Sequence, residues 1–220
     1  MQNPYMLLLK YRKLLLSELS NLSSIPREVL TEKLRVVSSY VRVLGEEVVV
    51  EKPLELALYL AKMGFSLKEL AAYVDWRDFE KFAAEILTSH GYVVLTNFLV
   101  TRPVRFEIDV IGVDPGSGRG IFVDCKHWSR GGLRTALLEA MEKHASRVEK
   151  FVKYFNWFRD KWIHFTHLRE IVPVIVTLTT PVIRVHEGVI TVSIQELNQF
   201  LIDIHTVLDA LGVVAVKVKK

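Results

Sequence analysis

The stretch that decides the fold is residues 106–128, which read Phe-Glu-Ile-Asp-Val-Ile-Gly-Val-Asp-Pro-Gly-Ser-Gly-Arg-Gly-Ile-Phe-Val-Asp-Cys-Lys-His-Trp. In both halves, apolar and charged residues alternate with the period of two that is typical of β-strands. Between the halves, residues 114–118 are rich in turn-forming residues. The pattern therefore predicts two antiparallel strands joined by a tight turn.

The predicted hairpin brings three charged side chains to one face of a sheet, namely Asp109, Asp124 and Lys126. Two carboxylates about 4 Å apart repel each other by about 1 kcal/mol in water and by about 4 kcal/mol at an effective dielectric constant of about 20. A hard divalent cation removes this cost, and Mg²⁺ is commonly held by one or two carboxylates together with water and phosphate oxygens. The lysine adds a compact positive charge that suits a phosphate or an attacking hydroxide.

This arrangement resembles the motif of the PD-(D/E)xK nuclease superfamily, which has the restriction-endonuclease-like fold. Asp109 matches the first acid of that motif, and Asp124-Cys125-Lys126 matches its acid-x-Lys. Glu80, on a helix predicted from Phe79 to His90, matches the acid that often precedes the two strands. Within the superfamily the chain looks most like the Mrr-type and archaeal Holliday-junction-resolvase-like branch. It departs mildly from the pattern, because no proline precedes Asp109 and an aspartate stands where Glu or Gln is common.

The resemblance implies an α/β fold with a mixed central sheet flanked by helices. It also implies a metal-dependent deoxyribonuclease in which Glu80, Asp109, Asp124 and Lys126 are catalytic. Asp109, Asp124, Glu80 and the backbone carbonyl of Cys125 would hold Mg²⁺ or Mn²⁺, while Lys126 would orient the attacking water. Restriction, repair and junction cleavage all stay open as roles, and a junction enzyme would be a homodimer. The alternative is an inactive nuclease-like fold that serves as a DNA-binding or assembly module.

Basic side chains around the motif are candidate DNA contacts, since phosphate oxygens are bound mostly by such groups. Two arginines precede the first motif strand, two residues follow the second, and three more lie on the long helix predicted after it. In related nucleases this helix commonly carries a polar residue that approaches the site, and residues 143 and 144 fall in the comparable region. The candidates are Arg102, Arg105, His127, Arg130, Lys143, His144 and Arg147.

The composition fits a cytoplasmic globular protein with an ordinary core. Half of the 220 residues are hydrophobic and the net charge is +4, which is compatible with a nucleic-acid partner. No apolar run reaches the roughly 18 residues that a membrane span needs, so no membrane association is expected. The single cysteine, Cys125, excludes an internal disulfide. We interpret it as a core residue rather than a nucleophile. The abundance of Lys, Arg and Glu favours a thermophilic, archaeal source.

The chain is expected to have an N-terminal helical domain over residues 1–74 and the nuclease-like domain over residues 75–220. In the first domain, helices are predicted for residues 4–20 and 26–44, with a short β-like run at 48–50. The pair of helices over residues 53–74 has the shape of a helix-turn-helix. Because its second helix offers few side chains that reach base edges, an ordinary helical hairpin is the favoured interpretation.

The second domain continues with a helix over residues 133–158, a buried strand over 171–178, short strands at 182–185 and 189–192, a helix over 194–211 and an edge strand from 213. The aromatic segment 154–165 is interpreted as core or dimer contact rather than as a base-stacking surface. A zinc site is excluded by the single cysteine and scattered histidines. No phosphate-binding loop is present, so a nucleotide cofactor is not expected.

Overall fold

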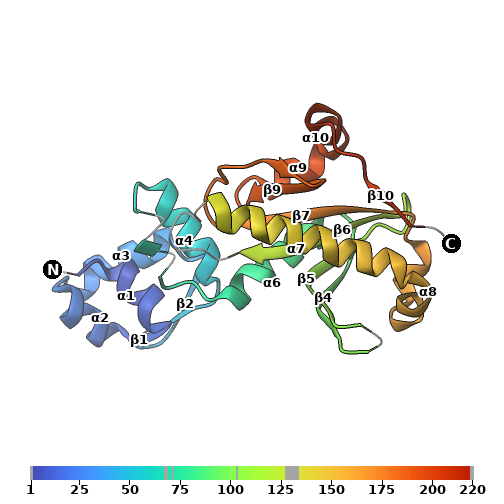
Figure 1. Cartoon of the computed structure of the whole chain (residues 1–220). Helices are drawn as coiled ribbons and strands as arrows, with labels where there is room; N and C mark the ends of the chain where they lie inside the picture. The colour runs from blue at the N-terminus through green and yellow to red at the C-terminus, as the bar shows by residue number, and fades with distance from the viewer. Residues whose placement is uncertain (1, 67–68, 71, 103, 127–133, 219–220) are drawn as a thin grey trace. The chain divides into compact units, whose positions relative to one another are not determined.

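The structure is a computed structural model that describes residues 2–66, 69–70, 72–102, 104–126 and 134–218. The chain divides into two compact units, residues 1–78 and 79–220 (Figure 1). The boundary falls inside the first turn of helix α6 (Trp76–Ser89), four residues after the boundary expected from the sequence. Each unit is described separately below.

The N-terminal unit contains a small sheet as well as helices. β1 and β2 both pair antiparallel with β3, so the strand order is β1-β3-β2. A β-like run was expected only at residues 48–50, which lie within β3. The elements in chain order are α1 (Pro4–Tyr11), β1 (Lys13–Leu15), α2 (Leu16–Ser23), α3 (Arg27–Val36), β2 (Val41–Leu44), β3 (Glu47–Val50) and α4 (Pro53–Lys62).

Two of the long helices expected here are interrupted. The helix over residues 4–20 breaks at Arg12, whose φ of 63° lies in the left-handed region. Leu14 then pairs with Val48 in the sheet, with both side chains buried. The helix over residues 26–44 ends at Val36, and the residues from Val41 become β2. Burial of these apolar side chains against the small sheet therefore overrides their helical spacing.

A helix-turn-helix arrangement occurs earlier in the chain than the sequence suggested. α2 ends at Ser23 and is followed by Ser24, which has a left-handed φ of 56°; α3 begins three residues after Ser24. With the β2–β3 hairpin pairing back to β1, the topology is that of a winged helix-turn-helix. The arginines of α3 are paired with acids, Arg27 with Glu46 and Arg35 with Glu32. Of the pair expected over 53–74, the first helix forms as α4, and residues 67–68 and 71 lie outside the described part.

The C-terminal unit is built on a mixed seven-stranded sheet of order β4-β5-β6-β7-β9-β8, with β10 paired to the start of β7. The β4, β5 and β6 pairings are antiparallel, whereas β6, β7 and β9 run parallel. After α6 the elements are β4 (Val93–Val100), β5 (Phe106–Val113), β6 (Arg119–Lys126), α7 (Arg134–Lys153), α8 (Phe155–Phe158), η1 (Arg159–Lys161), η2 (Ile163–His167), β7 (Glu170–Thr177), β8 (Val185–His186), β9 (Val189–Ser193), α9 (Leu197–Ile202), α10 (Ile204–Leu211) and β10 (Val216–Lys217).

The predicted turn between β5 and β6 forms as the sequence indicates. The carboxylate of Asp114 accepts hydrogen bonds from the backbone N–H of Gly116 at 2.8 Å and from the hydroxyl of Ser117 at 2.5 Å. Gly118 has a φ of 77°, and a Cβ there would lie 2.7 Å from the side chain of Arg169 and 2.8 Å from the carbonyl oxygen of His167. Glycine is therefore required at this position both by the backbone conformation and by the close approach of the neighbouring segment.

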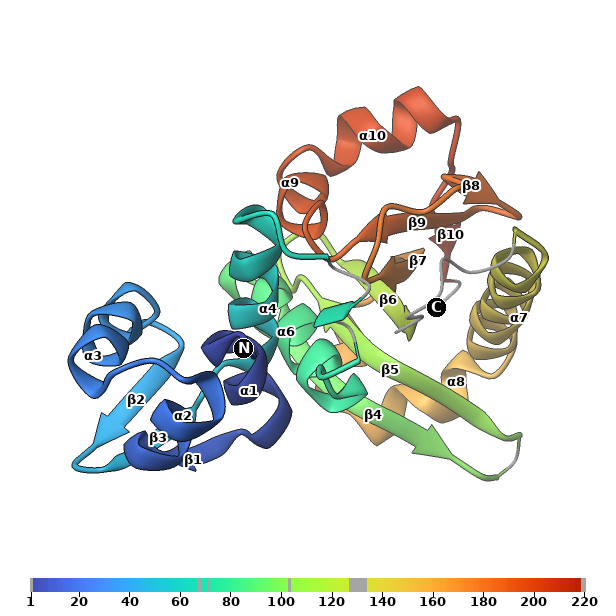
Figure 2. The same ribbon diagram turned by 90° about the vertical axis from the view of Figure 1, so that its left-hand side faces the viewer.

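Helices cover the sheet on both faces, with α6 and α9 on one side and α7 on the other (Figure 2). On the first side, the ring of His90 at the end of α6 lies 3.0 Å from the side-chain oxygen of Asn198 on α9. On the other side, Leu137 and Met141 of α7 pack against Ile175 of β7. All but the first residue of β7 is buried, which confirms the prediction of a central strand covered on both faces.

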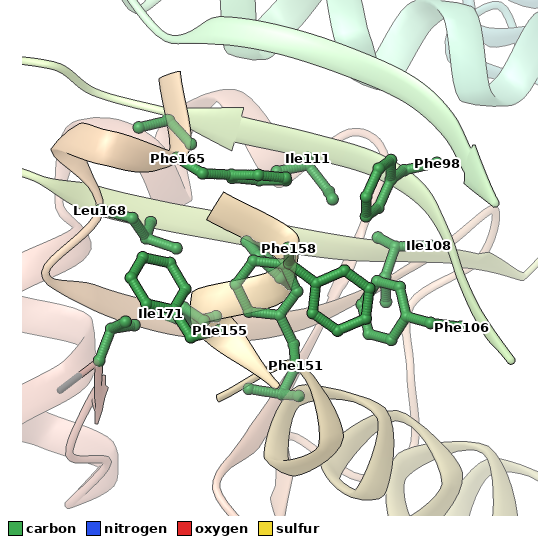
Figure 3. Close-up of a cluster of buried hydrophobic side chains, with 14 residues drawn as sticks. Phe98, Phe106, Ile108, Ile111, Phe151, Phe155, Phe158, Phe165, Leu168 and Ile171 are labelled. Carbon is green, nitrogen blue, oxygen red and sulfur yellow. The ribbon is translucent and has the colours of Figure 1, made fainter. Parts of the chain in front are cut away.

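An aromatic cluster fixes the C-terminal end of α7 against β5 (Figure 3). The rings of Phe151 and Phe158 stack with their centroids 5.0 Å apart and their planes 10° from parallel. Phe106 of β5 contacts both rings, and Phe165 of η2 closes the cluster. The three phenylalanines of the segment 154–165 thus belong to the core, while its tyrosine and two tryptophans are partly buried against it. Such close packing gives α7 a fixed register on the sheet.

Candidate active site

The two motif aspartates lie where the β5–β6 ladder ends. Val110 and Val123 form the last backbone pair, and Asp109 and Asp124 are the next residues beyond it on each strand. At this point the carboxylate of Asp109 accepts a hydrogen bond of 2.7 Å from the backbone N–H of Cys125. A side chain thus satisfies a backbone donor of the neighbouring strand, which ties the two motif segments together.

Asp124 is buried and carries one cation on each carboxylate oxygen. The residue is 2% exposed. Its Oδ2 lies 2.6 Å from Nζ of Lys126, and its Oδ1 accepts a hydrogen bond of 2.6 Å from the guanidinium of Arg147 on α7. Burial raises the pKa of this carboxyl, but the charges of Lys126 and Arg147 contribute to a larger opposite effect, so the pKa is lowered overall. Asp124 is therefore ionised at neutral pH.

The pKa values of the other two acids, Asp109 and Glu80, are shifted in the opposite direction. Burial, followed by the charge of Asp124, raises the pKa of Asp109 above its ordinary value. Glu80 comes from α6 and is 6% exposed; burial, followed by the charges of Asp109 and Asp124, raises its pKa to about 7. Lys126 opposes this effect at both acids. Three carboxyl groups thus share one electrostatic environment, and two of them resist ionisation.

Replacement of Glu80 by glutamine is expected to stabilise the metal-free protein at neutral and alkaline pH. Glu80 titrates near pH 7 in the folded state and near 4.5 when unfolded, so the folded state binds the proton more tightly. The wild-type protein therefore loses stability as the pH rises from 4.5 to 7, and the variant lacks this loss. We expect a gain of about 1–3 kcal/mol at about pH 8 and none near pH 4.

Urea denaturation of both proteins in EDTA at the two pH values measures this difference. Glu85→Gln is the matched control, because Glu85 is an exposed acid on the same helix whose ion pair with Lys81 spans 3.9 Å. Its substitution should change stability by less than about 0.5 kcal/mol. A Glu80→Gln variant that is less stable than wild type at about pH 8 would contradict the assignment.

His144 is buried inside the domain rather than available to a phosphate. It is 0% exposed, and its Nε2 lies 2.9 Å from the carbonyl oxygen of Phe122. Burial lowers the pKa of the ring to about 4, so the imidazole is neutral and Nε2–H donates to the carbonyl. This placement favours a structural role, in which His144 ties α7 to β6.

Arg147 is the residue of α7 that contacts Asp124. It lies about one turn beyond Lys143 and His144, the two residues expected to correspond to the polar helix residue of related nucleases. Lys143 is exposed and pairs with Glu139 of its own helix at 3.6 Å. The spacing from His144 to Arg147 puts both on the same side of a helix. That spacing was the available signal for a contact with β6, but the sequence alone did not say which side of the helix faces the sheet.

The remaining candidate DNA contacts are exposed on a loop or lie outside the described residues. Arg102 and Arg105 are exposed on the connection between β4 and β5, and Arg105 lies 3.9 Å from Glu107. β4 extends to Val100, so this connection begins after that residue. His127 and Arg130 fall within residues 127–133, which the structure does not describe.

Cys125 lies between the two motif residues of β6 and is partly exposed rather than fully in the core. Burial, followed by the charges of Asp109 and Glu80, raises the pKa of its thiol well above the ordinary value. The thiol is therefore protonated at neutral pH and is a poor nucleophile. This agrees with the sequence interpretation that Cys125 does not act as a nucleophile.

The donor set suits a hard divalent cation. Carboxylate and carbonyl oxygens are the ligands that Mg²⁺ and Mn²⁺ prefer, and Mg²⁺ usually completes its shell with water. Among the described residues, no three His, Cys, Asp or Glu side chains form a ready-made metal cage. Asp124 has both oxygens paired with cations, as described above, so a metal ion would have to share or displace these partners.

Comparison with known proteins agrees with this geometry. Residues 71–152 match the model of a family described as "Restriction endonuclease" (Mrr_cat). This stretch contains Glu80, Asp109, Asp124, Lys126 and Arg147. It is a restriction-endonuclease-like domain of the PD-(D/E)xK type. The predicted resemblance and fold class are thereby confirmed, and the domain supports a nuclease-type function in general.

Two further proteins are similar to the chain. An uncharacterized protein of the archaeon Archaeoglobus fulgidus is 28% identical over 139 residues, which cover 62% of this chain and 97% of that protein. The crystal structure of protein VC1899 from Vibrio cholerae is similar over 94% of this chain, with a TM-score of 0.36 and 14% identity. The alignment spans about half of that second protein, 51% of its length. Neither comparison assigns a substrate to the restriction-endonuclease-like domain.

No helix within the described parts of the chain is both long and apolar enough to cross a membrane.

Proposed function

We propose that the protein is a divalent-metal-dependent deoxyribonuclease that hydrolyses phosphodiester bonds of DNA. The observation that carries the proposal is the convergence of Asp109 and Asp124 at the end of the β5–β6 ladder. Lys126 lies 2.6 Å from Asp124, and the charges of both acids contribute to the raised pKa of Glu80. Such a concentration of perturbed carboxyl groups beside a lysine is costly in a purely structural role.

In the proposed mechanism, Asp109, Asp124 and the carbonyl of Cys125 would hold Mg²⁺ or Mn²⁺, and Glu80 would join them directly or through a water molecule. The ion would polarise the scissile phosphate and acidify a water molecule. Lys126 orients the attacking water through its ammonium group and stabilises the negative charge that develops on the phosphate. Glu80, with its raised pKa, can hold or release a proton near neutral pH.

The proposed DNA contacts outside the acidic site are basic. Arg102 and Arg105 on the β4–β5 connection and Lys143 on α7 are exposed and available to phosphates. His127 and Arg130 remain proposals from the sequence. We further propose that residues 1–74 form a separate N-terminal domain, that residues 75–220 form the nuclease domain, and that the enzyme acts as a homodimer. Light scattering of the purified protein tests the dimer directly.

The experiment that tests the function is cleavage of a labelled panel of DNA substrates, comprising linear duplex, single strand, flap, four-way junction and closed circle. We expect cleavage with Mg²⁺ or Mn²⁺ and none in EDTA. Cutting of the closed circle would establish an endonuclease, and preference for the junction would indicate a resolving role. Tight DNA binding without cleavage of any substrate would overturn the proposal in favour of a DNA-binding or assembly module.

A further inference from the structure

Arg147 occupies a position in the site that the proposed mechanism does not use. It reaches from α7 to Oδ1 of Asp124 at 2.6 Å. The side chain of Asp124 is 3% exposed, whereas that of Arg147 is 32% exposed, so the guanidinium lies between the buried acid and the solvent. An arginine carries five N–H donors, and the structure shows one nitrogen, Nη1, bound to Asp124.

The distribution of charge around Arg147 is uneven. Among the described residues, Lys126 and Arg147 are the two cations that contact Asp124. Asp109 receives only a backbone hydrogen bond from Cys125 among the contacts described for its carboxylate. Arg147 adds a second positive charge at Asp124, which also offsets the negative charge of the neighbouring Asp109 in the metal-free protein. A divalent cation held by the two acids supplies this positive charge itself, so Arg147 is no longer required beside Asp124 once the ion is bound.

A divalent cation bound by Asp109 and Asp124 would compete with these two partners. Lys126 lies on the same strand as Asp124, two residues further on, and the proposed mechanism keeps it in the site to orient the attacking water. Arg147 approaches Oδ1 from a different element through a long, flexible side chain that is partly in solvent. Arginine also forms a planar fork that matches two phosphate oxygens at once. Arg147 is thus the partner that can leave and find a new ligand.

We propose that Arg147 is an exchangeable counter-ion of Asp124: it neutralises the acid in the metal-free protein, yields Oδ1 when a divalent cation binds, and then contacts the phosphodiester of the substrate. This rests on the proposed function and extends it, because it makes metal binding and DNA binding mutually reinforcing. By thermodynamic linkage, each ligand raises the affinity of the protein for the other by the same factor.

The first test is calorimetric titration of Mg²⁺ and of Mn²⁺ into the full-length wild type, Arg147→Gln and Lys150→Gln. The last variant is the matched control, since Lys150 is an exposed lysine about one turn further along α7 and its substitution removes the same charge. Arg147→Gln should bind the metal about tenfold more tightly, because the competing cation is gone. Lys150→Gln should stay within about twofold of wild type. Weaker or unchanged metal binding by Arg147→Gln would overturn the exchange.

The second test measures the coupling between the two ligands. The affinity for a labelled DNA duplex is measured in EDTA and in Ca²⁺, which takes the same oxygen ligands as Mg²⁺. In wild type, Ca²⁺ should tighten DNA binding by about fivefold or more. In Arg147→Gln this factor should be at least about twofold smaller than in wild type, because only the direct attraction between the ion and the phosphate remains; in Arg147→Lys, which keeps the charge, it should lie closer to the wild-type value. Equal coupling in wild type and Arg147→Gln would refute a transfer of Arg147 to phosphate.

The two proposals fail in different ways. A wild-type protein that binds no divalent cation and cuts no substrate would contradict the proposed function itself. A wild-type protein that binds metal and cuts DNA, with no change in metal affinity in Arg147→Gln, would contradict only the role of Arg147. Thermal melting of each variant checks folding, and Arg147→Met, which keeps the length of the apolar stem, serves as the second variant if the glutamine variant does not fold.

Discussion

Substitution of Lys126 by methionine is expected to lower the rate of DNA cleavage by about a thousandfold or more. A thousandfold corresponds to about 4 kcal/mol of lost transition-state stabilisation, which is the size expected for one well-placed charge in a site that excludes water. Metal binding should survive, because Lys126 is not a ligand and its loss removes a cation that lies 2.6 Å from Asp124. The variant should therefore bind Mg²⁺ at least as tightly as the wild type.

Single-turnover cleavage and calorimetry on the same preparations separate the two effects. Lys150→Met, a substitution of an exposed lysine in the last turn of α7, provides a control of equal charge change and should cut at close to the wild-type rate. Cleavage by Lys126→Met within about tenfold of wild type would refute the role assigned to this lysine.

Substitution of Asp109 by asparagine is expected to abolish both metal binding and cleavage, while stabilising the metal-free fold. Asparagine keeps an oxygen that can accept the hydrogen bond from the N–H of Cys125, so the tie between the strands survives. The charge that a divalent cation needs is lost, and we expect a fall in cleavage of about a thousandfold or more.

The stability gain follows from the raised pKa of Asp109, which is caused first by burial and then by the charge of Asp124. Because the folded state holds this proton more tightly than the unfolded state, wild-type stability falls as the pH rises through the titration of Asp109. The asparagine variant lacks this loss and should melt at a higher temperature in EDTA at neutral pH, with the difference vanishing in acid. A variant that melts lower at neutral pH, or still binds Mg²⁺ like wild type, would contradict the assignment of Asp109.

The sequence predicted the placement of the charged motif residues where they lie on strands with a clear alternating pattern. Asp109, Asp124 and Lys126 lie on adjacent strands because alternating runs flank an Asp-Pro-Gly-Ser-Gly turn, and a turn of this kind sets the pairing. Contacts that depend on helix packing were not visible in the same way. The approach of Arg147 to Asp124 and the burial of His144 depend on how α7 rotates on the sheet, which the aromatic cluster around Phe151 determines.

The fold followed the sequence most closely in the central strands. The apolar run at 171–178 could only be a covered strand, since few alternatives bury so many consecutive side chains. Elsewhere the spacing of apolar residues predicted helices that the structure does not contain or that it interrupts. Leu14 carries a helical pattern but pairs in a sheet with Val48, and the helix expected over 194–211 begins at Leu197 and is interrupted at Asp203. In these places tertiary contacts override helix propensity, and the energy of those contacts cannot be inferred from the local sequence pattern.

The thiol of Cys125 gives the site a chemical reporter of its own. It is the only cysteine in the chain, and the neighbouring carboxylates help to keep it protonated. A bound cation that neutralises those carboxylates favours the thiolate, which is the form that reacts with alkylating reagents. The rate of alkylation therefore records the electrostatic state of the acids in solution, without DNA and without turnover.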